Sequence, residues 1–281
     1  MANDLLRQSD AFFRSLAQPI ADQFGLKHLP DHFSTLAYTA FFYTFLHIVV
    51  APTLSPIVAP VSYAKLKGRR GRNNWHIHLV SFVNAILLSY LSFISLHHPE
   101  LEEDKTFGWH ESIGVLDAVA VGYFFWEFVD AVWNYTDFGF VLHGLICTIL
   151  YTMTFRPFLG YYSPRFLLWE LSTPFLNIHW LLDKLDLTGS IYQYVNGILL
   201  LGVFFGVRLV YGIWMSSEFF VTLFNVRNEI NTFYLVALAI GNTVLNGLNI
   251  FWFYKMIATL RKRFEVDVAP KLTDAEPKKV Q

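Results

Sequence analysis

Cysteine is almost missing from this sequence, which holds one, Cys147, among 281 residues. A single thiol excludes a disulfide framework within the chain, and no Cys/His spacing typical of a zinc site occurs, so we expect no metal. An excess of one charge is also missing, and the net charge of −1 argues against a nucleic-acid partner. A cleavable signal peptide is not evident, since the first apolar run begins near Phe33 behind a polar leader. We expect the first span itself to direct insertion.

Long apolar runs, by contrast, are abundant. Hydrophobic residues make up 54% of the chain and the mean hydropathy is +0.39, which is too apolar for an ordinary soluble domain. Seven runs approach the roughly 20 residues that a helix needs to cross a bilayer. They are residues 33–51, 76–96, 113–134, 138–155, 165–183, 191–215 and 232–256. The sequence therefore predicts an all-α fold, a polytopic membrane helix bundle of about seven transmembrane helices.

Composition divides the chain into four segments. They are a leader at 1–32, the first transmembrane helix with a Pro-rich connector at 33–63, six transmembrane helices at 64–260, and a polar tail at 261–281. The leader has apolar residues at roughly helical spacing, which predicts either an interfacial amphipathic helix or a partly ordered segment. Pro52, Pro56 and Pro60 should end the first helix, and Pro174 should kink the fifth. The tail should be disordered.

Basic residues are concentrated in one loop and acidic residues in the next. Residues 65–72 hold five Lys and Arg, whereas residues 100–111 hold five Asp and Glu against one lysine. The excess of positive charge in cytoplasmic loops places the basic loop and the C-terminus in the cytoplasm and the N-terminus in the lumen. The acceptor sequence Asn134-Tyr135-Thr136 then lies on the cytoplasmic side, and we expect it to be unmodified.

Lys278 and Lys279 stand fourth and third from the end of the sequence. Two lysines at these positions on a cytoplasmic tail resemble the dilysine retrieval signal of endoplasmic reticulum (ER) membrane proteins, an address that is read by a receptor. The alternative is a charged end that only adds solubility. We favour the retrieval signal, which predicts a multi-pass protein of the ER membrane.

Several polar and ionisable residues lie inside the apolar runs. An ionisable group at such depth costs at least about 2.5–3.5 kcal/mol, so it usually faces a protein interior and marks function. From the helical rise of about 1.5 Å per residue, five of them should share one layer: Glu127, Asp130, His143, Asn177 and His179. Glu170 and Arg208 should share a second layer and form an ion pair, which either locks the helices together or takes part in chemistry.

His143 admits two interpretations. A general base is one, because imidazole has a suitable pKa and a nearby carboxylate, Asp130 or Glu127, can orient the ring. A hydrogen bond between helices is the other. Cys147 lies one turn further on the same helix face, but we expect it to serve packing. Asn242, Asn246 and Asn249 form a strip in the last span that should hold helices together or contact a lipid headgroup.

The segment Leu168–Trp180, which contains Glu170, Pro174 and Asn177, resembles the TLC domain family when taken with Arg208. That family contains the ceramide synthases, the translocating-chain-associated membrane protein and the ceroid-lipofuscinosis ER protein. The likeness is closest to the small TLC domain-containing proteins. It implies an ER or other endomembrane location and work on lipids. Ceramide synthases use a His-His pair; His143 matches its first member, and Gly144 stands at the second.

Three functions follow as expectations. The first is a protein that binds, senses or moves a lipid in membrane lipid homeostasis, with Glu170, Asn177, His179 and Arg208 at the lipid. The second is a lipid acyltransferase with His143 as base, which would take acyl-CoA as co-substrate and no other cofactor. The third is an ER cargo receptor. The partner is a membrane lipid in the first two, and a homo-oligomer or a membrane-protein partner remains open.

Overall fold

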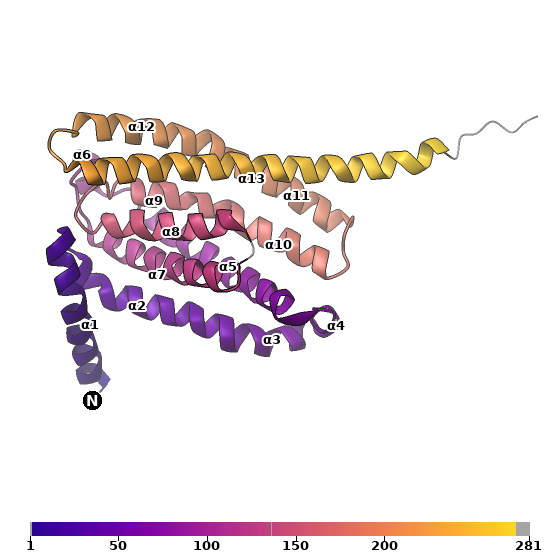
Figure 1. The fold of residues 1–281 in the computed structure, drawn as a ribbon, viewed down its shortest axis with the longest axis horizontal. Coiled ribbons are helices and arrows are strands. Elements are labelled where there is room, and N and C mark those ends of the chain that lie inside the picture. The colour runs from indigo at the N-terminus through magenta and orange to yellow at the C-terminus, as the bar shows by residue number, and fades with distance from the viewer. Residues whose placement is uncertain (1, 136, 274–281) are drawn as a thin grey trace, which may run out of the picture.

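The computed structural model describes residues 2–135 and 137–273, and every regular element within them is helical. In chain order (Figure 1) these are α1 (Ala2–Phe24), α2 (Leu29–Phe45), η1 (Leu46–Val50), α3 (Ala51–Val58), α4 (Pro60–Ala64), α5 (Gly68–Ile94), α6 (Pro99–Glu103), α7 (Glu111–Trp133), α8 (Phe138–Met153), α9 (Tyr162–Leu167), η2 (Leu168–Ser172), α10 (Thr173–Lys184), α11 (Ile191–Phe204), η3 (Phe205–Val210), α12 (Tyr211–Asn225) and α13 (Thr232–Thr273).

Five helices are long and apolar enough to cross a membrane: Leu29–Val58, Gly68–Ile94, Glu111–Trp133, Ile191–Asn225 and Thr232–Leu260. Two of the predicted spans are built differently. The fourth is the shorter apolar helix α8, and the fifth is broken into α9, η2 and α10. The prediction of an all-α polytopic membrane bundle is confirmed.

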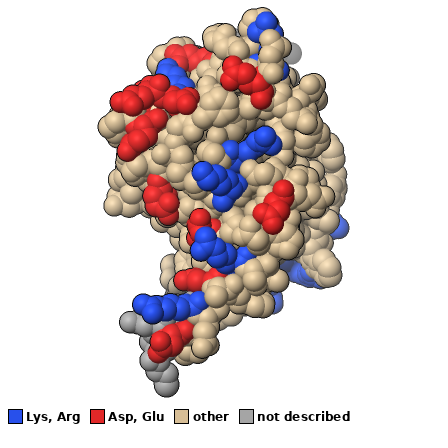
Figure 2. Space-filling model, turned by 90° about the vertical axis from the view of Figure 1, so that its left-hand side faces the viewer, with Lys and Arg blue, Asp and Glu red and all other residues tan. Residues whose placement is uncertain are grey.

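Apart from α1, which runs across the bundle at one end, the long helices lie side by side along one long axis, so the turns gather at two ends (Figure 1). The α1–α2 turn, α6 and the α12–α13 turn lie at one end, and α4, the α10–α11 turn and the far end of α13 lie at the other. The basic loop and the C-terminal part of α13 are therefore at the same end, as an odd number of crossings requires. The α6 end displays both acidic and basic side chains (Figure 2), so its surface is not uniformly negative.

The first span contradicts one prediction, because its helix does not end at Pro52. It continues through Pro52 and Pro56 and stops before Pro60. The reason is the π-helical turn Leu46–Val50, in which Ala51 donates to the carbonyl five residues back. Such a widened turn lets a helix absorb the proline that follows it.

The fifth span departs from a regular helix just before Pro174, the residue at which we predicted a kink. The chain adopts a 3₁₀ turn over Leu168–Ser172, and α10 begins directly afterwards with Pro174 in its first turn. Proline is favoured in a first turn because the N–H that it lacks would have no intrahelical partner there. The 3₁₀ turn places Glu170 on an irregular stretch of backbone in the middle of the bundle.

The leader is helical, which was one of its two predicted forms, and the C-terminal end is more helical than we predicted. The leader forms α1, which buries Ala17 and Ala21 and leaves Leu5 and Phe12 exposed. At the other end α13 runs to Thr273, so residues 261–273 continue the helix where we expected a disordered tail. This stretch has no Gly or Pro before Pro270, and residues without such breakers extend a helix at little cost. Lys278 and Lys279 lie outside the described residues.

Candidate functional site

Arg208 is the centre of a buried polar cluster that joins three parts of the bundle. The side chain is 6% exposed and lies in the π-helical turn Phe205–Val210. Its guanidinium donates to Glu170 at 3.4 Å, to Ser172 at 2.9 Å, to Thr173 at 3.2 Å and to Asn249 at 3.0 Å. The predicted Glu170–Arg208 pair is therefore present. A buried charge with this many partners is largely compensated.

Irregular backbone supports both members of this pair. Glu170 sits in the 3₁₀ turn and Arg208 in a π turn, and π turns inside α-helices occur frequently at functional sites. Asn249 comes from the asparagine strip on α13, and its neighbour Asn246 donates to Ser216 on α12 at 2.9 Å. The strip thus bonds to protein groups on neighbouring helices, and Asn249 joins the polar cluster itself.

His143 and Glu127 form a second polar contact. The Nδ1 atom of His143 lies 3.0 Å from Oε2 of Glu127, and the hydroxyl of Tyr123 donates to Oε1 of the same carboxylate at 3.3 Å. The imidazole also packs edge-on against Phe124 and Trp252. Glu127 is therefore the carboxylate that orients this ring.

An internal cavity connects the two contacts. Its volume is about 60 Å³, enough for a few waters at roughly 10–15 Å³ each, or for a short stretch of acyl chain. His143, Cys147, Glu170 and Arg208 all line it. The remaining lining is mostly apolar and comprises Phe124, Leu150, Tyr151, Thr154, Phe158, Leu159, Tyr162, Ser163, Phe166, Leu167, Trp169, Phe219, Leu238, Asn242 and Leu245.

One donor in this wall has no acceptor. Within the part of the chain that the structure describes, the buried indole N–H of Trp169 has no hydrogen-bond partner. A buried donor left in this state costs roughly 1–3 kcal/mol. The indole nitrogen lies against α12, because a Cβ placed at Gly212 would come within 2.5 Å of it.

The other members of the predicted layer lie elsewhere. Asp130 accepts from Asn134 at 2.8 Å and from Asn73 at 3.3 Å, on the side of α7 that faces α5. Asn177 bonds to His78 and Ser81 on α5. His179 packs against α11, where its ring lies 3.6 Å from a Cβ placed at Gly197. The residues of the predicted layer therefore do not converge on one site, because depth along a helix does not fix the direction in which a side chain points.

Sequence reasoning missed Asp117. This fully buried carboxylate on α7 accepts from the hydroxyls of Thr154 and Ser163, and both of these residues line the cavity. The signal was available, because Asp117 lies inside the third apolar run just as Glu127 does. Arg165 was also missed; it is buried, lies over the ring of Tyr161 and donates to Glu102 at 2.7 Å.

Gly144 marks a backbone contact between α7 and α8. A Cβ at this position would lie 3.0 Å from the Cα and N atoms of Phe128, closer than packed atoms normally approach. A histidine side chain therefore cannot stand beside His143 without parting the two helices. The His-His pair of the ceramide synthases is excluded by packing as well as by the residue type.

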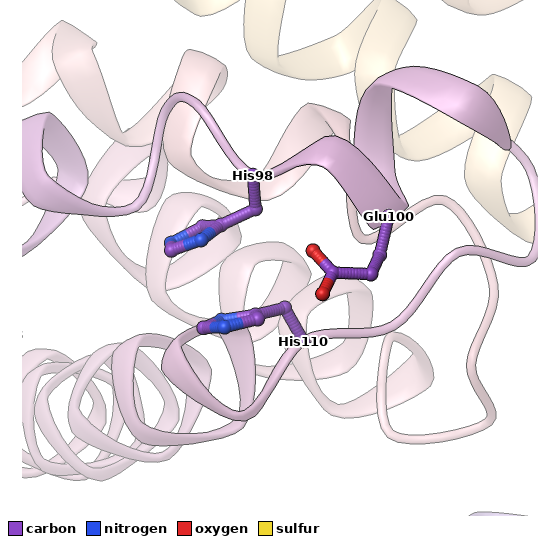
Figure 3. A group of neighbouring side chains, drawn as sticks. All are labelled: His98, Glu100 and His110. Atoms are coloured by element: carbon purple, nitrogen blue, oxygen red, sulfur yellow. The ribbon is translucent and has the colours of Figure 1, made fainter.

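His98, Glu100 and His110 are the one group among the described residues whose ligand atoms are close enough to suggest a metal, all within 4.8 Å of one another (Figure 3). The rings stack in parallel with centroids 3.7 Å apart, so their lone pairs do not converge on one point. Both rings bond to the Ser112 hydroxyl, and Nδ1 of His110 accepts from the Ser112 backbone N–H as it caps α7.

We interpret this group as a hydrogen-bonded cap, because a metal would have to part the rings and break those bonds. The pKa of His98 is lowered, first by burial and then by the neighbouring His110. A neutral imidazole suits a ring that must bond to a hydroxyl. Sequence spacing does not reveal the group, because the loop fold is what brings position 110 back to position 98.

Comparison with known proteins gives a consistent result. The model of the family described as TLC domain matches residues 74–258. A TLC domain-containing protein of Schizosaccharomyces pombe is 38% identical over 92% of this chain and 89% of its own length. Topoisomerase I damage affected protein 4 of Saccharomyces cerevisiae is 29% identical over 82% of this chain and 85% of its own length. TLC domain-containing protein 4-B of Danio rerio is 30% identical over 74% of this chain and 80% of its own length. The chain therefore belongs to the TLC domain family.

Proposed function

We propose that this protein binds a membrane lipid inside its helix bundle and thereby senses or moves it in membrane lipid homeostasis. The observation that carries the proposal is the internal cavity, whose apolar wall also presents His143, Glu170 and Arg208. Ligand sites typically combine an apolar lining with a few fixed polar groups. The resemblance to the TLC domain family, which implies work on lipids, also supports the proposal.

The chemistry of the cavity indicates which part of a lipid it takes. The apolar wall suits an acyl chain, and the polar side chains of His143 and Arg208 in the same wall suit a carbonyl or hydroxyl oxygen. A volume of about 60 Å³ is too small for a whole lipid, since even drug-sized ligands occupy pockets of roughly 300–1,000 Å³. The bound lipid would therefore place one acyl segment here and leave the remainder between the helices.

We also propose that the protein resides in the ER membrane with its N-terminus lumenal and its C-terminus cytoplasmic. The basic loop and the C-terminal part of α13 lie at one end of the bundle (Figure 1), which supports a common cytoplasmic side. Lys278 and Lys279 supply the retrieval signal in this proposal.

Native mass spectrometry of protein purified in mild detergent tests lipid binding. Wild-type protein should carry a co-purifying lipid. Leu245→Trp, which fills the cavity wall from α13, should lose it. Ile240→Trp is the matched control, because it lies on the same helix and is 57% exposed. Lipid-free wild type, or equal occupancy in both variants, would contradict the proposal, and cross-linked lumenal clients without bound lipid would indicate the cargo receptor.

The contact between His143 and Glu127 supports a second candidate, an acyltransferase. His143 would take the proton of an amine or hydroxyl as that group attacks the acyl-CoA thioester, and would pass it to the departing thiolate. Glu127 would orient the ring. Asp130 would not, because its carboxylate points toward Asn73 on α5. Untargeted lipidomics of cells that carry His143→Ala or Glu127→Gln distinguishes an enzyme from a lipid binder. Loss of a specific acylated product, while the purified variant still carries lipid, would indicate an enzyme. An unchanged acyl profile would indicate a binder.

A further inference from the structure

A second, larger cavity opens at the end of the bundle that carries the basic loop. Its volume is about 800 Å³, and none of its lining residues belongs to the central cavity. We call it the interfacial groove. It is lined by Thr44, His47, Ile48, Pro52, Gly68, Arg69, Arg72, Asn73, His76, Trp126, Val129, Asp130, Trp133 and Asn134.

Three helices form the groove, each with one face. The lining positions on α2, η1 and α3 run from 44 to 52, those at the start of α5 from 68 to 76, and those at the end of α7 from 126 to 134. Within each set they recur at intervals of three and four, which is the spacing of a single helix face. The groove is therefore the space between the first span, the start of α5 and the end of α7, and it coincides with the π turn Leu46–Val50.

The floor of the groove is already hydrogen-bonded. Asp130 accepts from Asn73 and Asn134, and Nε2 of His47 donates to the side-chain oxygen of Asn73 at 2.9 Å. The two arginines do not serve this carboxylate. Arg69 donates to the side-chain oxygen of Asn134 at 3.2 Å, and among the described residues Arg72 has no carboxylate within ion-pair distance.

Positive charge thus faces the opening of the groove. Arg69 and Arg72 are exposed and lie in the first turns of α5, where the free N–H groups of the helix also attract anions. Arginine pairs with phosphate oxygens through two parallel hydrogen bonds. The groove therefore suits a phosphate group.

The groove also presents apolar side chains that face outward. Trp133 is 76% exposed, Ile48 is 64% exposed and Val129 is 47% exposed, and all three belong to helices that are long enough to cross a membrane. A soluble phosphate compound would leave these side chains unused, whereas a lipid would lay its acyl chains along them. We propose that the interfacial groove binds the phosphate-bearing headgroup of an anionic membrane lipid, at a site separate from the central cavity.

Lipid titration of the full-length protein in detergent, read by native mass spectrometry, tests this site. The probes are dioleoyl phosphatidic acid and dioleoyl phosphatidylcholine, which share their acyl chains. Wild type should retain phosphatidic acid in preference. Arg69→Gln/Arg72→Gln should weaken that retention roughly tenfold or more, as expected for two basic groups at a membrane surface.

Lys67→Gln/Arg70→Gln is the matched control, because it removes the same two charges from the same loop and neither residue lines the groove. Thermal melting should be unchanged in both variants, since all four side chains are exposed. An equal loss of phosphatidic acid binding in the control would show that net charge alone causes the effect, and it would overturn the site. Displacement of phosphatidic acid by glycerol 3-phosphate or coenzyme A at matched concentration would also overturn it, because the ligand would then be soluble.

Discussion

Arg208 and Glu170 face each other at 3.4 Å from two helical segments that both leave regular α geometry at that point. Removing one partner strands the other charge in the bundle. We expect Arg208→Met or Glu170→Leu alone to destabilise the protein by about 3–5 kcal/mol, the cost of breaking a buried pair. Thermal melting of purified protein in detergent measures the loss.

The double variant Glu170→Leu/Arg208→Met is the informative control. If the cost comes from an unpaired charge, the double variant should be more stable than either single variant, because no charge remains. A double variant that loses as much as the sum of the two single variants would show that the pair acts through independent contacts.

Gly144 provides a test of the contact between α7 and α8. Gly144→Ala places a methyl group 3.0 Å from the backbone of Phe128, and overpacking of this kind costs about 1–3 kcal/mol. Gly202→Ala is the matched control, since no atom lies within 4 Å of its Cβ position. It should be neutral or should stabilise the helix, because alanine is favoured over glycine there by about 1 kcal/mol. Equal melting temperatures for the two variants would contradict the contact.

The sequence predicted heights within the bundle better than directions. Rise per residue placed Glu170 opposite Arg208, and Glu127 level with His143, and both pairs are in contact. It also grouped Asp130 with His143, although Asp130 faces α5 instead. Depth follows from counting residues, whereas direction depends on how each helix is rotated by its neighbours.

Irregular turns and tertiary loops were beyond sequence reasoning for a related reason. The π turn at Leu46–Val50 carries the first helix past Pro52, and no residue in that turn signals it. The interfacial groove and the group of His98, Glu100 and His110 each combine segments that are separated along the chain. Asp117 differs, because its position in an apolar run was enough to identify it.

Replacement of Asp117 by asparagine should destabilise the protein less than replacement by leucine. Its carboxylate accepts from the buried hydroxyls of Thr154 and Ser163, and the carbonyl of Asp117→Asn can replace part of this. Asp117→Leu leaves the Ser163 hydroxyl without its acceptor, at about 1–3 kcal/mol, whereas the Thr154 hydroxyl keeps the Tyr151 carbonyl at 2.7 Å. We expect the melting temperature of Asp117→Asn to lie near that of wild type and the melting temperature of Asp117→Leu to lie well below it. The reverse order would show that the Ser163 hydroxyl finds another acceptor.

Asp137 caps α8 from the loop outside the spans. It accepts from the Gly139 N–H at 2.7 Å, which lowers its pKa below the usual value of 3.8, and Lys255 lowers it further. Because the pKa is lower in the folded state, the cap contributes stability above about pH 4 and loses it as the pH falls through the folded value. Asp137→Ala should cost about 0.5–2 kcal/mol at neutral pH.

Hydrogen exchange of the first turn of α8 measures this effect. Wild type should lose protection there as the pH is lowered below about 4, once intrinsic exchange rates are taken into account. Asp137→Ala should show low protection at every pH. A variant that keeps the acid dependence of wild type would assign that dependence to another carboxylate.

Membrane orientation can be read from glycosylation. Asn134 belongs to the acceptor Asn134-Tyr135-Thr136, and its side chain bonds to Asp130 and Arg69 beside the basic loop. With that loop cytoplasmic, Asn134 should carry no glycan, an acceptor tag fused before residue 1 should be modified, and the same tag fused after Gln281 should not. A mobility shift that is removed by endoglycosidase reports each case. Modification of Asn134 or of the C-terminal tag would invert the topology, and it would then place the interfacial groove and its two arginines on the lumenal face.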